Sequence, residues 1–263
     1  MSVSIHPSAI VSPEAKIAPN VSIGPFSIIG PNVEISTGCI IGAQVHIDGH
    51  TKIGENNRFE SFCSIGAAPQ DTSYKGEPTQ TVIGSGNTFR EYVSVHRGTL
   101  KDNGITNVGN NSLFMAYVHL GHDVQFGSNC VVANSTNFAG HVKVGDRVII
   151  GGGSQISQFV SIGRGAYIGG ATAIDRDIPI FCTAYGNRVK LKGVNIIGMR
   201  RQGVEKAAIS EVLDFYRTME ASALSPRAFV EHEEHMAEFK DNVIISEMVS
   251  FIRVSEVGIA PFL

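Results

Sequence analysis

A six-residue repeat, a glycine at a fixed place within it, and a change of pattern after Ile180 predict an all-β fold followed by a small α-helical domain. Counted in sixes from Ile5, the first position is apolar wherever the frame holds, and most of its residues are β-branched. The second position is often glycine, and the fifth is usually small or β-branched. Each unit predicts one short strand, and three units, about eighteen residues, predict one coil of a triangular parallel β-helix.

Stacking of these coils predicts the hydrophobic core of the prism. We expect each apolar first-position side chain to point into the prism. Because successive coils lie at the strand spacing of roughly 4.8 Å, it stacks on its equivalent in the next coil. We expect the second-position glycine to let the chain turn at the corner. Cys39, Cys63 and Cys130 all fall at the small fifth position, which indicates packing residues.

Two polar interruptions and a change of period divide the chain. Segments 67–80 and 97–107 break the count and are rich in turn residues, which predicts loops that project from the prism. We expect the β-helix to cover residues 1–187 and the helical domain residues 188–263. In the latter, apolar residues at helical spacing predict helices over 205–221 and about 243–254, and Ser225–Pro226 predicts the start of another.

Composition excludes several classes of protein. The 263 residues are 43% hydrophobic and 17% charged, which indicates a folded chain, and the net charge of -3 gives no global attraction to nucleic acid. The N-terminus lacks the features of a signal peptide, and no apolar run is long enough to cross a membrane. The four cysteines have no CxxC spacing, so neither a zinc site nor a redox pair is expected. Together these features favour the cytoplasm.

Histidines interrupt the repeat in one region of the chain. In a stacked coil, residues eighteen apart lie one above the other, which predicts a polar patch across two coils with its side chains pointing outward. The register stacks Asn137 on His119, His141 on Asp123 and Gly140 on His122.

This patch has the residue types of an acid–base site. A histidine titrates near neutral pH and takes a proton from an alcohol, while a neighbouring carboxylate orients it. No serine or cysteine lies next to this histidine in the frame as a nucleophile, which favours direct attack by a substrate hydroxyl. The backbone N–H of Gly140 is placed to face a developing oxyanion.

Other interpretations compete with this one. A histidine in a β-helix is often only an exposed surface residue, and His96, at the start of the second loop, fits a structural role. Some trimeric β-helix proteins bind zinc with three histidines and act as carbonic anhydrases. Here His119 and His122 are three residues apart, and no third histidine falls at the coil-related position upstream, so no metal is expected.

Several motifs resemble those of the acyl-carrier-protein-dependent UDP-N-acetylglucosamine O-acyltransferases, over essentially the whole chain. The clearest are Gln70–Asp71, His96-Arg-Gly-Thr99, His119-Leu-Gly-His-Asp123, Ala139-Gly-His141, Gln158–Phe159, Gly186–Asn187 and Gly193-Val-Asn195. The resemblance implies a left-handed β-helix, a cytoplasmic homotrimer with active sites between subunits, and the first step of lipid A biosynthesis. It implies no cofactor, since the 3-hydroxyacyl donor is carried on the 4′-phosphopantetheine of acyl carrier protein.

The resemblance also implies roles for individual residues. His122 is the general base, Asp123 holds it, and Gly140 supplies the oxyanion N–H. His119 and His141 line the site and position the substrate, and Asn137 belongs to the same substrate-binding patch. Gln70 and Asp71 reach the glucosamine ring, and Gln158, Asn195 and Arg201 reach the nucleotide. Gly170 ends the acyl channel, beside the bulky Tyr167. A basic set suits the acidic carrier protein; it comprises Lys190, Lys192, Arg200, Arg201 and Arg217.

Several positions depart from the family pattern. Residues of other types stand where the family has a loop lysine, a histidine, a glutamate and a second arginine; they are Ser73, Ser157, Ile197 and Gln202. Arg188 also differs from the usual residue near the acyl channel. These departures leave open the acyl length and a second acceptor, a nucleotide sugar acylated on a 3-amino group.

Overall fold

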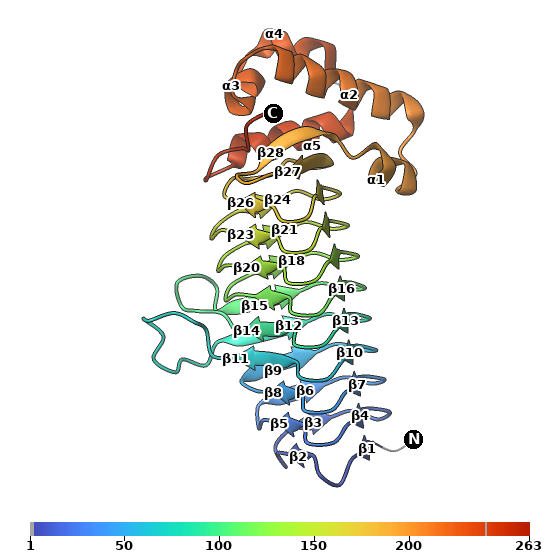
Figure 1. Ribbon diagram of the computed structural model, residues 1–263, viewed down its shortest axis with the longest axis vertical. Coiled ribbons are helices and arrows are strands. Elements are labelled where there is room, and N and C mark those ends of the chain that lie inside the picture. Colours follow the sequence, from blue (N-terminus) through green and yellow to red (C-terminus); the bar gives the residue numbers. More distant parts are fainter. Residues whose placement is uncertain (1–2, 240) are drawn as a thin grey trace.

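The repeat forms a long column of stacked coils with the helices gathered at its C-terminal end (Figure 1). The computed structural model describes residues 3–239 and 241–263, so positions 1, 2 and 240 of the predicted domains lie outside the described residues. Three sheets form the faces of the column, and every pairing is parallel except that of β27 with β28. The predicted left-handed parallel β-helix with a small helical C-terminal part is confirmed.

Up to β26, each sheet takes every third strand, and the hairpin of β27 and β28 is added to the end of sheet 1. The 11-stranded sheet 1 contains β1 (Ser4–Ile5), β4 (Ser22–Ile23), β7 (Ile40–Ile41), β10 (Arg58–Phe59), β13 (Thr88–Phe89), β16 (Leu113–Phe114), β19 (Val131–Val132), β22 (Ile149–Ile150), β25 (Tyr167–Ile168), β27 (Cys182–Tyr185) and β28 (Lys190–Val194). The 9-stranded sheet 2 contains β2 (Ile10–Val11), β5 (Ile28–Ile29), β8 (His46–Ile47), β11 (Ser64–Ala67), β14 (Ser94–His96), β17 (His119–Leu120), β20 (Asn137–Phe138), β23 (Gln155–Ile156) and β26 (Ala173–Ile174). The 8-stranded sheet 3 contains β3 (Lys16–Ile17), β6 (Val33–Ile35), β9 (His50–Ile53), β12 (Gln80–Ile83), β15 (Ile105–Val108), β18 (Gln125–Phe126), β21 (Lys143–Val144) and β24 (Ser161–Ile162).

The core is the stack of first-position side chains. His119 pairs with Asn137 and Leu120 with Phe138, which confirms the eighteen-residue register in the region of the histidines. Phe59 stacks on Phe89 with ring centroids 4.8 Å apart, which is one coil spacing. The ladder is buried along most of the column, whereas Ile5 in the first coil is exposed because no coil lies beyond it.

The corners turn at a residue other than the one predicted. At the fourth position of the unit, Asp123 and His141 adopt left-handed backbone conformations, with φ of 61° and 63°. The second-position glycine instead permits close stacking, because a Cβ on Gly121 would lie 2.8 Å from the carbonyl oxygen of Phe138 in the next coil. The expectation that glycine makes the corner is therefore wrong, and its small size is what the fold uses.

Both predicted loops project from the edge of sheet 2 (Figure 1). The first runs between β11 and β12, over residues 68–79, and the second between β14 and β15, over residues 97–104. The second is shorter than expected because β15 begins at Ile105. The pairing of β14 with β11 and β17 resumes on either side of the insertions, so the loops leave the stack intact.

The C-terminal end is capped by a hairpin and helices. The antiparallel hairpin of β27 and β28 spans the predicted boundary at 187 and 188. The helices are α1 (Ile196–Arg201), α2 (Lys206–Ala221), α3 (Pro226–Glu231), α4 (Glu233–Met236), a 3-10 turn (Ala237–Phe239) and α5 (Val243–Val254). The three predicted helices are present, and Ser225 caps α3 as expected by accepting a hydrogen bond from the N–H of Ala228. No helix among the described residues is long and apolar enough to cross a bilayer.

Candidate active site

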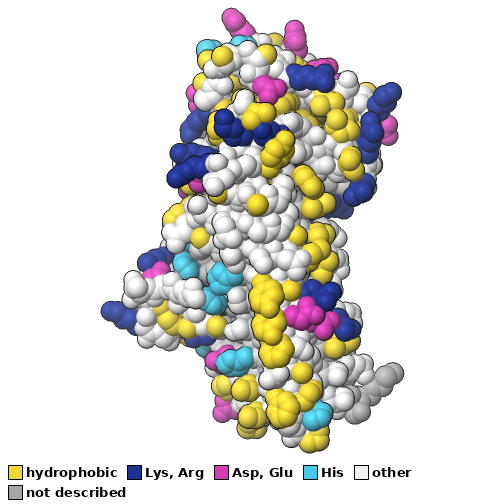
Figure 2. Space-filling model, in the orientation of Figure 1, with side chains coloured by type: hydrophobic (Ala, Val, Ile, Leu, Met, Phe, Trp, Pro, Cys, Tyr) yellow, Lys and Arg dark blue, Asp and Glu magenta, His cyan; other side chains and the backbone are white. Residues whose placement is uncertain are grey.

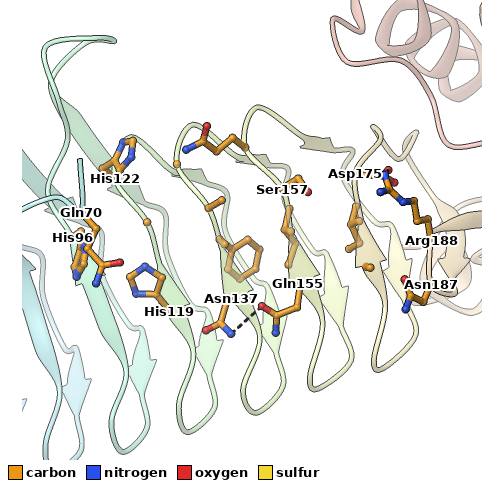
Figure 3. A pocket seen from close by; sticks show the side chains of 18 residues that line it. Gln70, His96, His119, His122, Asn137, Gln155, Ser157, Asp175, Asn187 and Arg188 are labelled. Atoms are coloured by element: carbon orange, nitrogen blue, oxygen red, sulfur yellow. Dashed lines mark hydrogen bonds and ion pairs between the residues drawn. The ribbon is translucent and has the colours of Figure 1, made fainter. Parts of the chain in front are cut away.

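The predicted polar patch lies along a groove on sheet 2, beside the two projecting loops. Figure 2 shows histidine side chains gathered there, and Figure 3 shows the residues that line the groove. The groove has a volume of about 620 Å³. Six of the predicted site residues line it, and they are Gln70, His119, His122, Asn137, Gly140 and Gln158.

His122 and Asp123 form a buried acid–base pair. His122 Nδ1 lies 2.8 Å from Asp123 Oδ2, and the side chains are 8% and 0% exposed. The His122 side chain points out of the prism into the groove, as predicted, but both side chains are buried because Thr99 of the second loop covers the corner at which they lie. With Nδ1 bound to the carboxylate, Nε2 is the ring nitrogen that is left for a substrate.

Gly140 provides the space in front of this imidazole. A Cβ at this position would lie 2.4 Å from Cε1 and 2.7 Å from Nε2 of His122. Only glycine therefore lets the ring stack over the next coil. Within the described residues, the Gly140 N–H donates to no backbone carbonyl, so it is available to a developing negative charge beside Nε2.

His141 approaches the same carboxylate from the next coil. Its Nε2 lies 3.7 Å from Asp123 Oδ2, and its Nδ1 lies 3.5 Å from a carboxylate oxygen of Asp102 in the second loop. The ring is stacked on Phe159, with centroids 4.7 Å apart, and is nearly perpendicular to the ring of His122. His141 faces a separate small cavity behind the corner, so its link to the groove is through Asp123.

His119 and His96 form a second histidine pair in the groove. His119 Nδ1 lies 2.7 Å from the hydroxyl of Ser94, and its ring meets that of His96 edge-on. Burial lowers the pKa of His119, and the charge of His122 adds to the effect. Burial lowers the pKa of His96 to about 4, with further contributions from His119 and His122. Sequence reasoning left the role of His96 open. The second loop shifts the count between the two coils, so the eighteen-residue spacing did not relate β14, which carries His96, to β17, which carries His119.

The two loops are joined by an ion pair between Asp71 and Lys101. Asp71 accepts hydrogen bonds from the backbone N–H and hydroxyl of Ser73, and its other oxygen lies 2.7 Å from Lys101 Nζ. The Lys101 ammonium and these hydrogen bonds hold the pKa of Asp71 far below its usual range. Ser73, which stands where the family has a loop lysine, thus supports Asp71 through its hydroxyl. The ammonium beside Asp71 is that of Lys101 in the second loop.

The remaining predicted residues lie elsewhere in the chain. Asn195, Arg201 and Tyr167 line a second cavity of about 930 Å³, between sheet 1 and α1. Asn195 caps α1 by accepting from the Gly198 N–H, and it donates to the carbonyl of Gly165. Gly170 lies against the backbone of Gly152 at another corner. A single chain therefore does not bring these residues to His122.

One group of described residues has the donor types of a metal site. Donor atoms of His122, Asp123 and His141 lie within 4.8 Å of one another. Both oxygens of Asp123 already accept hydrogen bonds, from the backbone and hydroxyl of Thr99 and from His122. His119, which the zinc alternative requires, is not in this group, so the donor set differs from the one that alternative predicts.

Known proteins resemble this chain along its full length. A protein from Halorhodospira halophila named acyl-(acyl-carrier-protein)–UDP-N-acetylglucosamine O-acyltransferase is 42% identical, covering 97% of this chain and 98% of its own. A protein of the same name from Burkholderia ambifaria is 46% identical over the same shares. The solved UDP-N-acetylglucosamine acyltransferase from Campylobacter jejuni superposes with a TM-score of 0.91 at 32% identity, covering 99% of this chain and all of that one.

A family model gives the same result for the C-terminal part. Residues 177–260 match the model described as UDP N-acetylglucosamine O-acyltransferase, domain 2. This range contains the hairpin of β27 and β28 and the helices α1 to α5. With full-length relatives well above 30% identity, the chain belongs to the acyl-(acyl-carrier-protein)–UDP-N-acetylglucosamine O-acyltransferase family.

Proposed function

We propose that this protein transfers a 3-hydroxyacyl chain from acyl carrier protein to the 3-hydroxyl of UDP-N-acetylglucosamine, the first step of lipid A biosynthesis. One observation carries the chemistry: the buried pair of His122 and Asp123 leaves Nε2 free beside Gly140 inside a groove. The names of the full-length relatives support both the donor and the acceptor.

His122 acts as the general base in this proposal. Nε2 takes the proton of the sugar hydroxyl as its oxygen attacks the thioester carbonyl carbon, and a C–O bond forms. Asp123 stabilises the imidazolium through Nδ1, and the Gly140 N–H donates to the oxyanion. As the intermediate collapses the C–S bond breaks, and the imidazolium returns the proton to the leaving thiolate of the phosphopantetheine.

The groove supplies the contacts of the sugar. His119, in which burial favours the neutral ring, offers one nitrogen to the substrate while Nδ1 is bound to Ser94. Gln70 reaches the groove from the first loop, and Asn137 and Gln158 line its wall. Beyond Ile156 and Ala173 the groove ends at the ion pair of Arg188 and Asp175. We infer that the acyl chain lies along the apolar part of the groove.

A homotrimer completes the proposal. Asn195 and Arg201 lie on a different face from His122, so a site that uses all three needs a neighbouring copy of the chain. In that arrangement Asn195 and Arg201 reach the nucleotide, and Tyr167 and Gly170 border the acyl channel. The basic residues of β28, α1 and α2 then offer a surface to acyl carrier protein in the cytoplasm.

Replacement of His122 tests the general base. We expect His122→Ala to lower kcat by at least about 100-fold, in line with the loss of general-base catalysis, while the circular dichroism spectrum stays unchanged. The matched control is His46→Ala, because His46 is an exposed histidine of the same sheet and lies outside the groove. Near-normal turnover by His122→Ala would remove the assigned role.

The acceptor needs its own assay. Carrier-protein thioesters of several chain lengths are offered with UDP-N-acetylglucosamine or with its 3-amino analogue, and acylated nucleotide sugar is measured. We expect the ester product with UDP-N-acetylglucosamine. Product with the amino sugar alone would assign the protein to N-acylation, because His122 serves either nucleophile equally well.

A further inference from the structure

Thr99, near the base of the second loop, holds the carboxylate of Asp123 at both oxygens. Its backbone N–H donates to Oδ1 at 2.8 Å, and its hydroxyl donates to Oδ2 at 2.6 Å. Thr99 is 3% exposed and Asp123 is fully buried. Hydrogen bonds to a carboxylate in a buried site are short and strong, so these two contacts fix the plane of the carboxylate.

The direction of the Thr99 hydroxyl is fixed as well. The backbone N–H of Lys101 donates to Thr99 Oγ1 at 3.3 Å, so one lone pair of this oxygen is already engaged. A carboxylate can only accept, so the hydroxyl proton must point at Asp123 Oδ2. The same Oδ2 faces Nδ1 of His122, which means that Thr99 and His122 share one acceptor atom.

The base of the loop is rigid enough to keep Thr99 in place. A Cβ on Gly98 would lie 2.3 Å from the backbone at Gly104 and Ile105, so the two strands of the loop touch at that point. Arg97 donates to the carbonyl of Gly66 at 2.7 Å and to the hydroxyl of Tyr74, and its guanidinium lies over the Tyr74 ring. The contacts of Gly98 and Arg97 therefore hold the backbone of the loop next to Thr99 in place.

His141 is a second histidine to which the Asp123 carboxylate could turn. Its Nε2 lies 3.7 Å from Oδ2, behind the corner and away from the groove. A carboxylate that lacked the Thr99 hydroxyl would be free to turn toward His141 and lengthen its bond to His122. The imidazole would then lose the orientation that points Nε2 at the substrate.

We propose that Thr99 is a positioning residue for acyl transfer, which holds Asp123 in line with Nδ1 of His122 and away from His141. The inference rests on the proposed role of His122 as the base. Thr99 is not among the residues that line the groove, so we expect its hydroxyl to act on kcat through the carboxylate and to leave substrate binding unchanged.

Thr99→Val removes the hydroxyl and keeps the shape and the backbone N–H. We expect kcat to fall on the order of 10- to 100-fold, the effect of losing one charge-assisted hydrogen bond, with KM for both substrates within about twofold. Thr99→Ser restores the hydroxyl and should return most of kcat. The control is Thr81→Val, because the Thr81 hydroxyl is buried in β12 and has no hydrogen-bond partner among the described residues.

Two results would overturn the inference. One is an unchanged kcat in Thr99→Val; the other is an equal loss in Thr99→Val and Thr99→Ser together with a raised KM and a lower thermal midpoint, which would mark a loop defect. The parallel His122→Ala measurement separates the two proposals. If His122→Ala is inactive and Thr99→Val is active, only the proposed role of Thr99 is contradicted. If His122→Ala is active, the assignment of His122 as the general base is contradicted.

Discussion

The histidines that line the groove differ in what surrounds them. His122 has a carboxylate at Nδ1, whereas His119 has only a hydroxyl. His96 Nδ1 is buried without a hydrogen-bond partner among the described residues, and its pKa of about 4 follows from that burial and from the neighbouring histidines. At neutral pH the groove therefore holds an uncharged His96, which suits a site that binds a polar, uncharged sugar ring.

The burial of His96 predicts a pH-dependent stability. Its pKa is lowered on folding, so between about pH 6.5 and 4 the unfolded chain binds a proton that the folded chain does not. Stability due to this group is therefore present above that window and falls as the pH drops through it, by at most about 1.4 kcal/mol per pH unit. Thermal midpoints measured from pH 7 to pH 5 should fall less steeply in His96→Gln than in the wild type.

His46→Gln is the control for this measurement, since His46 is exposed on the same sheet. It should show the wild-type slope. A His96→Gln slope equal to that of the wild type would contradict the assigned burial effect.

At the scale of elements, the two loops act together. The second loop bonds Asp123 through Thr99, Asp71 through Lys101 and His141 through Asp102, all within four residues of chain. Asp71 is only 8% exposed, whereas Lys101 is 55% exposed, so the ion pair covers the Asp71 carboxylate from the solvent side. The loops thereby connect Asp71 to the acid–base pair.

Lys101→Met tests this junction. Without the ammonium, the first loop loses its tie to the second, and we expect KM for the nucleotide sugar to rise severalfold while kcat changes less. Lys16→Met removes a comparable ion pair, with Glu34, at the N-terminal end of sheet 3, and should leave both constants unchanged. The measurement is KM for the nucleotide sugar from steady-state kinetics. An unchanged KM in Lys101→Met would show that the ion pair does not order the part of the first loop that contacts the nucleotide sugar.

At the scale of the whole molecule, the column separates two functional surfaces. The groove with His122 lies on sheet 2, and the cavity with Asn195 and Arg201 lies between sheet 1 and α1. A rigid column cannot bend to join them, because each coil is stacked on the next along its length (Figure 1). A shared site therefore requires two chains side by side.

Mixed assemblies test the shared site. Chains with His122→Ala and chains with Arg201→Ala are each expected to be nearly inactive, yet co-expressed in equal amounts they form sites with both residues intact. With random association, His122 is intact at half of the sites, and Arg201 from the neighbouring chain is intact at half of those. About a quarter of the wild-type activity should therefore return. Activity no higher than that of the separate variants would place Arg201 outside the site of its neighbour.

Sequence alone determined the β-helix, its register and the residues that meet at the acid–base pair. This was possible because the fold is nearly one-dimensional: contacts recur every eighteen residues, so spacing along the chain translates directly into position, as it does for His119 and Asn137. The three predicted helices were also found, because each shows an amphipathic spacing or a cap.

Tertiary structure decided what lies outside the repeat. The loops have no period, so neither the cover that Thr99 places over Asp123 nor the pair of Asp71 and Lys101 was visible in the sequence. Burial of His122 and His96 depends on that cover and on the coils around it. The distance between the groove and Asn195 likewise depends on which face each residue occupies after the chain has left the repeat at the β27–β28 hairpin.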